Sequence, residues 1–159
     1  ALVDKSLKVK VLKSGTNTIN LGLNTKVEVF SPEENIVSDN FNDYSSVIKI
    51  SFLNTSFLFT GDAENFTEDY IISNNCNLKS DVLKVGHHGS RTSSSEDFLK
   101  SIKPESALIS NGMYNSYGHP HDVTLRRLQE NNIAIYRTDT MGRIHISTDG
   151  NEWQISTER

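Results

Sequence analysis

The chain has 159 residues, which is enough for one domain with a hydrophobic core. Apolar residues make up 35% and charged residues 23%, a composition that excludes a disordered chain. The net charge of −4 gives no electrostatic reason for non-specific nucleic-acid binding, although a local basic patch or a bound metal is compatible with it. No apolar run approaches the roughly 18 residues that a membrane span needs.

The chain begins at Ala1 without a methionine and has no recognisable signal peptide, so we expect a processed or cut chain. Its single cysteine, Cys76, excludes an internal disulfide. We expect this thiol to have no functional role, and cysteine usage therefore does not identify the cellular compartment.

The first sixty residues favour strands separated by turn-forming residues. Apolar alternation predicts strands over residues 7–12, 18–23, 26–30, 47–52 and 56–60. Between them, residues 31–44 are polar and rich in Asn, Asp, Glu and Ser. We expect this segment to be a loop and the most flexible part of the chain.

Helices and strands alternate after residue 60. The pattern predicts helices over residues 63–72, 95–102 and 121–131, with Ser95 as an N-cap. Strands are expected over residues 81–85, 107–110, 133–136, 143–147 and 152–155. This order predicts an α/β (α+β) layered fold with a mixed sheet. Because no repeat or linker divides the chain, we expect residues 1–159 to form a single domain.

The first chemical motif is Gly61-Asp62, which directly follows an apolar strand. A carboxylate at a strand end suits a divalent cation and can bridge two of them. The alternative is that Asp62 caps the helix predicted from residue 63.

The second motif is a pair of histidines, His87 and His88, flanked by Gly86 and Gly89 at the end of another strand. Glycine allows close backbone approach, and neutral imidazole is a common metal ligand. Extended backbone would point the two rings in opposite directions, so we expect one ring to ligate a metal directly. The alternative is a turn with two surface histidines.

The third motif places His119 and His121 on either side of Pro120. Proline favours extended backbone before it, and residues two apart in extended backbone point the same way. The alternative is a helix start with exposed histidines in its first turn. A fifth histidine, His145, alternates within a predicted strand and is expected to be an ordinary strand residue.

These three motifs all follow predicted strands, where open α/β sheets gather their ligands. The sequence contains no GxGxxG, Walker-type or GxSxG motif. The motifs therefore favour a metal-dependent hydrolytic site over a dinucleotide, P-loop or serine-hydrolase site.

Four longer runs resemble the metallo-β-lactamase-fold hydrolases of the ComEC type, at residues 57–64, 81–99, 110–121 and 136–146. That family comprises the lactamase-like domain of the competence DNA-uptake channel and its free-standing relatives. The resemblance covers about residues 7–148. It implies an αββα sandwich with a two-metal site at one edge of its sheets, usually zinc and in some members manganese.

The resemblance also implies roles for individual residues. Asp62 matches the bridging aspartate, and one of His87 and His88 matches a histidine ligand. His119 and His121 match a catalytic pair for substrate binding or proton transfer. We further expect substrate contacts from Ser90, Arg91, Thr92 and Tyr117. Arg91, Lys84, Arg126 and Arg137 could also form a local phosphate-binding patch. The alternative is that these four are ordinary solvated surface charges.

The implied activity is hydrolysis of a phosphoester by a metal-activated water. The substrate would be a DNA strand in an uptake protein and a smaller phosphoester or ester in other relatives. An uptake-channel domain would face outward, whereas a free-standing relative could be cytoplasmic or secreted. The alternatives are a non-catalytic binding or assembly module and a hydrolase of a non-nucleotide ester.

One departure from the family pattern is large. The upstream metal motif, HxHxDH or HxDxDH, is absent, because no histidine precedes His87. We therefore expect this chain to be the C-terminal half of a lactamase-like domain, with half of the sandwich and part of the metal site. Affinity depends on a closed ligand set, so this half alone is expected to be inactive.

Overall fold

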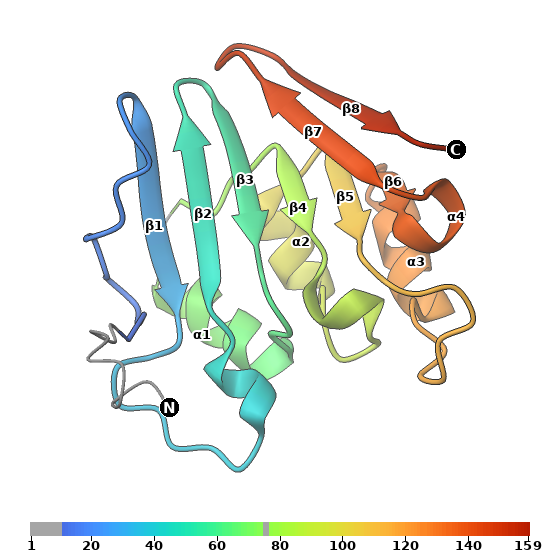
Figure 1. The fold of residues 1–159 in the computed structure, drawn as a ribbon. Coiled ribbons are helices and arrows are strands. Elements are labelled where there is room, and N and C mark those ends of the chain that lie inside the picture. Colours follow the sequence, from blue (N-terminus) through green and yellow to red (C-terminus); the bar gives the residue numbers. More distant parts are fainter. Residues whose placement is uncertain (1–10, 75–76) are drawn as a thin grey trace, which may run out of the picture.

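The computed structural model describes residues 11–74 and 77–159. Its large sheet has six strands that lie side by side in chain order (Figure 1). They are β1 (Thr25–Ser31), β2 (Val47–Phe52), β3 (Thr55–Phe59), β4 (Val82–Lys84), β5 (Ser106–Ile109) and β6 (Ala134–Arg137). The first three strands pair antiparallel, and β3 to β6 pair parallel. The predicted mixed sheet is therefore confirmed.

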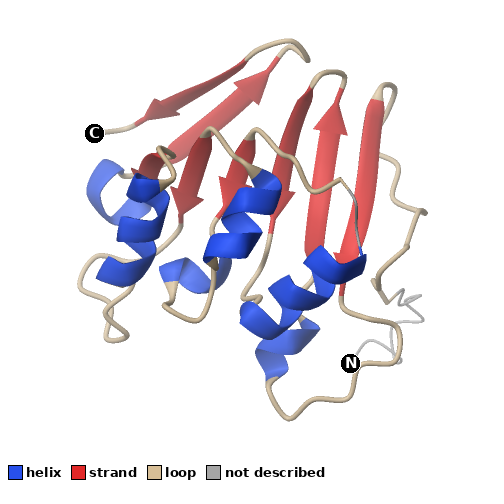
Figure 2. Ribbon diagram, turned by 180° about the vertical axis from the view of Figure 1, so that it is seen from behind, coloured by secondary structure: helices blue, strands red, loops and turns tan. Residues whose placement is uncertain are grey.

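Helices connect the parallel strands and cover one face of the sheet (Figure 2). They are α1 (Asn65–Asn74), α2 (Glu96–Ile102) and α3 (Asp122–Glu130). Ser95 caps α2 as predicted, because its hydroxyl accepts a hydrogen bond from the Phe98 N–H at 3.3 Å. Shorter elements complete the fold: the 3₁₀ helices η2 (Phe41–Tyr44) and η3 (Gly86–Gly89), α4 (Thr138–Met141), and the hairpin of β7 (Ile144–Thr148) and β8 (Trp153–Thr157).

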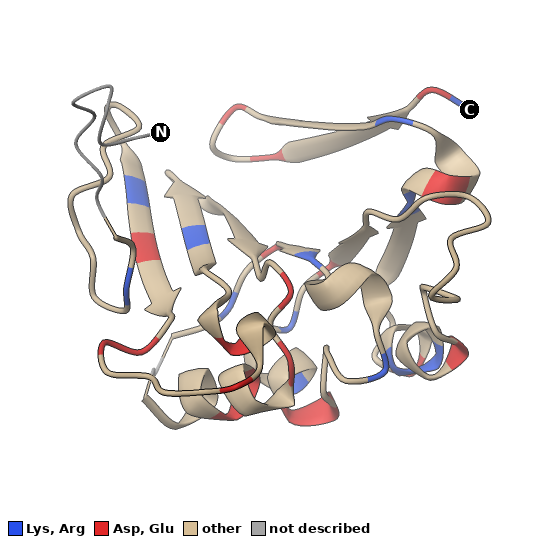
Figure 3. Ribbon diagram, turned by 60° about the horizontal axis from the view of Figure 1, so that its bottom comes forward, with Lys and Arg blue, Asp and Glu red and all other residues tan. Residues whose placement is uncertain are grey.

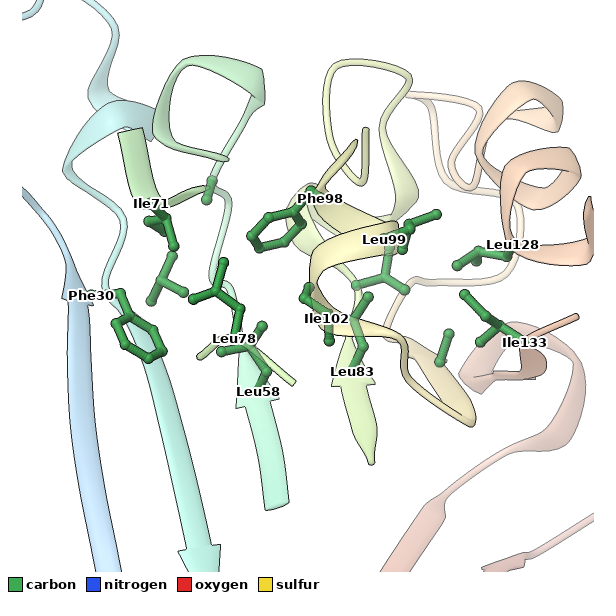
Figure 4. Packing of buried hydrophobic residues seen from close by; sticks show 14 of the residues in the cluster. Phe30, Leu58, Ile71, Leu78, Leu83, Phe98, Leu99, Ile102, Leu128 and Ile133 are labelled. Atoms are coloured by element: carbon green, nitrogen blue, oxygen red, sulfur yellow. The ribbon is translucent and has the colours of Figure 1, made fainter. Parts of the chain in front are cut away.

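The hydrophobic core lies between the helices and the sheet (Figure 4). Leu58 and Leu83 project from neighbouring strands and are almost completely buried. Ile71, Phe98 and Leu128 meet them from the three helices. Burial of a side chain of this size stabilises a fold by about 1.5–3 kcal/mol. This core fixes the strands, and so also fixes the loops at their ends.

The opposite face of β2 and β3 is apolar but only partly covered. Side chains alternate along a strand, so Phe57 and Phe59 point away from the face that carries Leu58. Ile50 and Ile48 are their cross-strand partners. Phe59 remains 43% exposed. The two-stranded sheet of β7 and β8 lies on the side of the large sheet away from the helices (Figure 1). The larger second layer that the sandwich would require stays a prediction.

One strand predicted from the sequence needs correction. The strand predicted over residues 18–23 is wrong, because the segment contains no strand in the structure. Asn20 instead accepts a hydrogen bond from the N–H of Gly22, whose φ of 109° belongs to a turn. The strand predicted over residues 7–12 lies mostly outside the described residues, and its last two positions, 11 and 12, are irregular. Cys76 also lies outside the described residues. The polar loop over residues 31–44 is confirmed but contains η2.

Candidate metal centre

The carboxyl ends of β3, β4 and β5 meet at one edge of the sheet because these strands are parallel neighbours. The chain leaves that edge in three loops, which cover residues 60–64, 85–95 and 110–121. Each of the three sequence motifs lies in one of these loops. The predicted convergence of the motifs therefore has a direct structural basis.

Asp62 projects from the end of β3 with its side chain 46% exposed. Its backbone N–H donates to the Ser45 hydroxyl at 3.1 Å, which fixes the turn after Gly61. The capping alternative is not supported, since α1 begins only at Asn65 and its N–H groups make no hydrogen bond with the Asp62 carboxylate. The carboxylate instead faces His88, with 3.6 Å between Oδ1 and Nε2.

His87 and His88 do not lie in extended backbone, so that prediction is wrong. Both residues have left-handed conformations, with φ of 43° and 54°, inside η3. The flanking glycines make this tight turn possible. A Cβ at Gly86 would lie 2.8 Å from the Ala63 carbonyl oxygen, and one at Gly89 would lie 2.6 Å from Pro120 Cβ. The glycines therefore allow all three loops to approach closely.

The four histidines of the motifs form one cluster, defined here as His87, His88, His119 and His121. The His119 ring lies at its centre, with ring centroids 5.4 Å from His87, 6.4 Å from His88 and 4.8 Å from His121. Tyr117 stacks on His119 at 5.9 Å. Burial lowers the pKa of His119, and the positive charge available on its neighbours lowers it further. His145 lies in β7 and makes no contact with the cluster.

Each outer histidine is held by a hydrogen bond to its Nδ1 atom. His87 Nδ1 lies 3.0 Å from Glu64 Oε1, and His88 Nδ1 lies 2.5 Å from the Ser110 carbonyl oxygen. His121 Nδ1 accepts a hydrogen bond of 3.0 Å from the Arg91 backbone N–H. His88 Nε2 lies 3.6 Å from Asp62 Oδ1, and within residues 11–74 and 77–159 the Nε2 atoms of His87 and His121 make no hydrogen bond.

Glu64 is a site residue that the sequence did not single out. Its carboxylate accepts hydrogen bonds from Thr92 Oγ1 at 2.6 Å and Asn40 Nδ2 at 2.8 Å, and it also contacts His87. Burial opposes its ionisation, but these hydrogen bonds outweigh that effect and lower the pKa of Glu64. The only signal for it in the sequence is its position two residues after Asp62. At that position it is indistinguishable from an ordinary acidic residue at the start of a helix.

The four predicted substrate contacts divide into two kinds. Ser90 is buried, and its hydroxyl pairs with that of Thr92 at 2.9 Å, so both residues support the loop and Glu64. Arg91 is exposed, and Tyr117 is 78% exposed. Thr92 is exposed as well, so of these four residues Ser90 alone is buried and the other three are open to a substrate.

Two hollows flank the cluster. One of about 300 Å³ is lined by His88, Ser110, Asn111, Gly112, Asn115, Tyr117 and His119. The other, of about 400 Å³, is lined by Arg91, Gly118, Pro120, His121, Asp122, Val123 and Arg126. The first is neutral, whereas the second carries two guanidinium groups and one carboxylate.

The predicted phosphate patch is therefore smaller than expected. Arg91 and Arg126 share a hollow, but Arg137 is engaged by both oxygens of Asp139 at 2.6 and 3.0 Å. Lys84 donates to the Val85 carbonyl at 2.7 Å. Burial lowers the pKa of Lys84, and the negative charge of Asp62 opposes that shift. Figure 3 shows basic segments next to acidic ones in the region of α3 and α4.

The donor atoms of Asp62 and His88 suit zinc or manganese. Two ligands about 2.1 Å from a tetrahedral ion lie about 3.4 Å apart, close to the 3.6 Å between Oδ1 and Nε2. Among the described residues, however, no group of three or more His, Cys, Asp or Glu side chains could hold a metal ion. This pair fits part of a metal site, and further ligands would have to come from other residues.

A comparison with protein families bears on the fold. The Metallo-beta-lactamase superfamily matches residues 13–112. Within the described part of the chain, no helix is long and apolar enough to cross a membrane.

Several curated proteins are also similar. ComE operon protein 3 of Bacillus subtilis is 42% identical over 103 residues, 65% of this chain and 13% of that protein. Recombination protein 2 of Haemophilus influenzae is 36% identical over 132 residues, 83% of this chain and 16% of that protein. Competence protein ComA of Neisseria gonorrhoeae is 37% identical over 106 residues, 66% of this chain and 15% of that protein. The chain thus spans about one sixth or less of the length of these relatives. With its mixed sheet and its superfamily match, the chain belongs to the metallo-beta-lactamase superfamily.

Proposed function

We propose that the natural protein containing this chain is a metal-dependent hydrolase of phosphodiesters, and that this chain contributes one side of its active site. One observation carries the proposal. Asp62 and His88 face each other at 3.6 Å on the sheet edge where the four histidines also meet. Two oxygen and nitrogen donors in this arrangement are the ligand types that zinc and manganese accept.

The division of labour follows from the hydrogen bonds. Asp62 and His88 would hold the metal, which when bound supplies Lewis-acid polarisation of the phosphoryl group. His119, whose pKa is lowered by burial, can exchange a proton with the reacting groups from the centre of the cluster. His121 and Arg91 would contact substrate oxygens beside it.

The two hollows support a phosphodiester as the substrate. Arg91 and Arg126 give one hollow the donors that phosphate oxygens require. The neutral hollow, with Tyr117 at its wall, would accept an organic substituent such as a base. The names of the relatives refer to competence and recombination, which fits a nucleic-acid strand as the natural substrate.

The test uses the natural protein with any sequence that flanks residues 1–159. Turnover of bis(p-nitrophenyl) phosphate and of a single-stranded oligonucleotide is measured with added zinc or manganese, for wild type, Asp62→Asn and His145→Gln. We expect turnover in wild type and in the His145→Gln control and none in Asp62→Asn. No turnover of either substrate by the wild type, at any metal concentration, would refute the proposal.

A non-catalytic binding or assembly module is the second candidate. It is favoured by one observation, that only a pair of candidate ligands is brought together in the described residues. This candidate predicts that the natural protein binds a single-stranded oligonucleotide through the Arg91 hollow without cleaving it. Binding by fluorescence anisotropy together with the turnover assay separates the two functions.

A further inference from the structure

The histidine cluster contains information on where its protons sit. A neutral imidazole carries one proton, so one ring nitrogen donates and the other accepts. The partner of Nδ1 therefore fixes the state of Nε2. Three of the four rings in the cluster have such a partner.

Two of these partners can only accept a hydrogen bond. The Ser110 carbonyl oxygen lies 2.5 Å from His88 Nδ1, and the Glu64 carboxylate lies 3.0 Å from His87 Nδ1. Both Nδ1 atoms must then carry the proton. The Nε2 atoms of His87 and His88 are left bare, as acceptors. The Asp62 carboxylate does not change this for His88, because the 3.6 Å between Oδ1 and Nε2 is too long for a hydrogen bond.

The third partner can only donate. The Arg91 backbone N–H points at His121 Nδ1 over 3.0 Å, so this Nδ1 atom is the acceptor. The proton of neutral His121 must then be on Nε2. His121 lines the hollow that also contains Arg91 and Arg126, so its proton faces the same space as two guanidinium groups.

We propose that the surrounding chain sets opposite tautomers within the cluster, so that His121 is a hydrogen-bond donor to a substrate phosphoryl oxygen while His87 and His88 are acceptors. The contact is a hydrogen bond, and the proton stays on His121. Glu64 and the Arg91 N–H are positioning groups that act through the rings. The role of His121 rests on the proposed phosphodiester substrate, whereas the tautomers do not.

Two hydrogen bonds hold the Glu64 carboxylate in position beside His87. Thr92 Oγ1 donates to one of its oxygens and Asn40 Nδ2 donates to the other, and together these bonds orient the carboxylate toward His87. Carboxylates that orient histidines in this way typically change site performance by about 10–100-fold when removed. Asn40 comes from the loop before β2, so this loop supports the cluster from outside.

The tautomers are measured directly in metal-free protein labelled with ¹⁵N-histidine, at about pH 8, where imidazoles are largely neutral. Long-range ¹H–¹⁵N correlation spectra distinguish a protonated ring nitrogen from a bare one. The chain has five histidines, which single His→Gln variants assign. We expect Nδ1–H in His87 and His88 and Nε2–H in His121. Nε2–H in His87 or His88, or Nδ1–H in His121, would overturn the proposal.

Glu64→Ala tests the positioning role. Without its acceptor, His87 should shift to Nε2–H, the form that a histidine side chain in water favours, while His121 keeps its state. Asn40→Ala is the matched control, because it removes a donor to Glu64 but leaves the carboxylate. An unchanged His87 in Glu64→Ala would overturn this role.

Activity of the natural protein tests the donor role of His121. A Gln side chain places an N–H near the position of Nε2, whereas Asn places its amide near Nδ1. We expect His121→Asn to lower kcat/KM by roughly 100-fold and His121→Gln by less than about tenfold. Equal losses in the two variants would overturn the donor role. A wild type without turnover would instead refute the proposed function, and the spectra would still decide the tautomers.

Discussion

The two ends of the large sheet each carry an aspartate beside a strand, and the two aspartates have opposite surroundings. Asp81 precedes β4, and its Oδ2 accepts hydrogen bonds from the Ser56 N–H at 2.6 Å and the Ser56 hydroxyl at 2.8 Å. Asp62 follows β3, and its carboxylate faces His88 at 3.6 Å, lies near the charge of Lys84 and accepts no hydrogen bond in the part of the chain that the structure describes. One carboxylate is used by the fold, and the other is left open.

The other polar side chains at the two ends of the sheet differ in the same way. Opposite the site, Thr55 pairs with Thr148 at 2.9 Å and Asn54 pairs with Asn151 at 3.0 Å, so polar side chains bind one another. At the site end, polar groups orient the histidine rings through Nδ1, and within the described residues the Nε2 atoms of these rings make no hydrogen bond. Polar residues at a strand end therefore indicate chemistry only when their hydrogen-bonding capacity is left unused by the fold.

The largest effect is expected at Asp62. Asp62→Asn should lower phosphodiester turnover of the natural protein by more than the roughly 100-fold typical of an outer-shell partner, because a candidate metal ligand is lost. Its free energy of unfolding should change by less than about 0.5 kcal/mol, since the side chain is half exposed. Turnover assays and urea unfolding check both parts. A large loss of stability would place Asp62 in the fold and remove the contrast with Asp81.

Gly89 tests how closely the site loops must approach. A Cβ there would lie 2.6 Å from Pro120 Cβ, and the residue has a φ of 84°. Gly89→Ala should therefore destabilise the protein by about 2–4 kcal/mol. Gly112→Ala in the same region is the control, because nothing lies within 4 Å of its added Cβ. Similar unfolding midpoints for the two variants would show that the loops can separate freely.

Asp81 should behave in the reverse way to Asp62. Asp81→Ala removes the oxygen that accepts both Ser56 hydrogen bonds, so we expect a loss of about 1–2 kcal/mol in the free energy of unfolding. The kcat of the folded variant should equal that of the wild type. A loss of kcat without a loss of stability would mean that this end of the sheet also takes part in the reaction.

The smallest effect is a pH dependence at Glu68, which is 1% exposed in α1. Burial raises the pKa of its carboxyl. The hydrogen bonds from Ser95 and Ser94 and the charge of Arg127 act in the opposite direction but are outweighed by burial. A raised pKa means that its contribution to stability is present below the ordinary value of 4.5 and is lost as the pH rises through the folded value.

Glu68→Gln removes this titration. Between about pH 4 and about pH 7, the unfolding free energy of the wild type should therefore fall relative to that of Glu68→Gln. Urea unfolding of both proteins across this range measures the difference. A wild type that gains stability relative to the variant as the pH rises would contradict the assignment.

The sequence predicted the elements whose apolar pattern is strong. The strand over residues 47–52 agrees with β2 at both ends, and the three motifs do meet at one edge of the sheet. Local pattern failed over residues 18–23, where alternation gave no account of the turn at Gly22. It also failed for the backbone of His87 and His88, because glycines on both sides permit conformations that the sequence does not specify.

Glu64 shows a different limit. Its partners Asn40 and Thr92 are 24 and 28 residues away in the chain, so only the fold brings them together. The tautomers depend on Ser110 and on the Arg91 backbone N–H in the same way. Residue types therefore indicated which side chains gather at the site, whereas the roles proposed for them required the hydrogen bonds of the folded chain.

The most direct test of the central claim is phosphodiester turnover by the natural protein before chelation, after chelation and after zinc or manganese is restored. The account predicts that turnover is lost on chelation and returns with metal in the wild type, and that it does not return in Asp62→Asn. Turnover that persists after complete metal removal would contradict the claim that Asp62 and His88 contribute to a metal-dependent hydrolytic site.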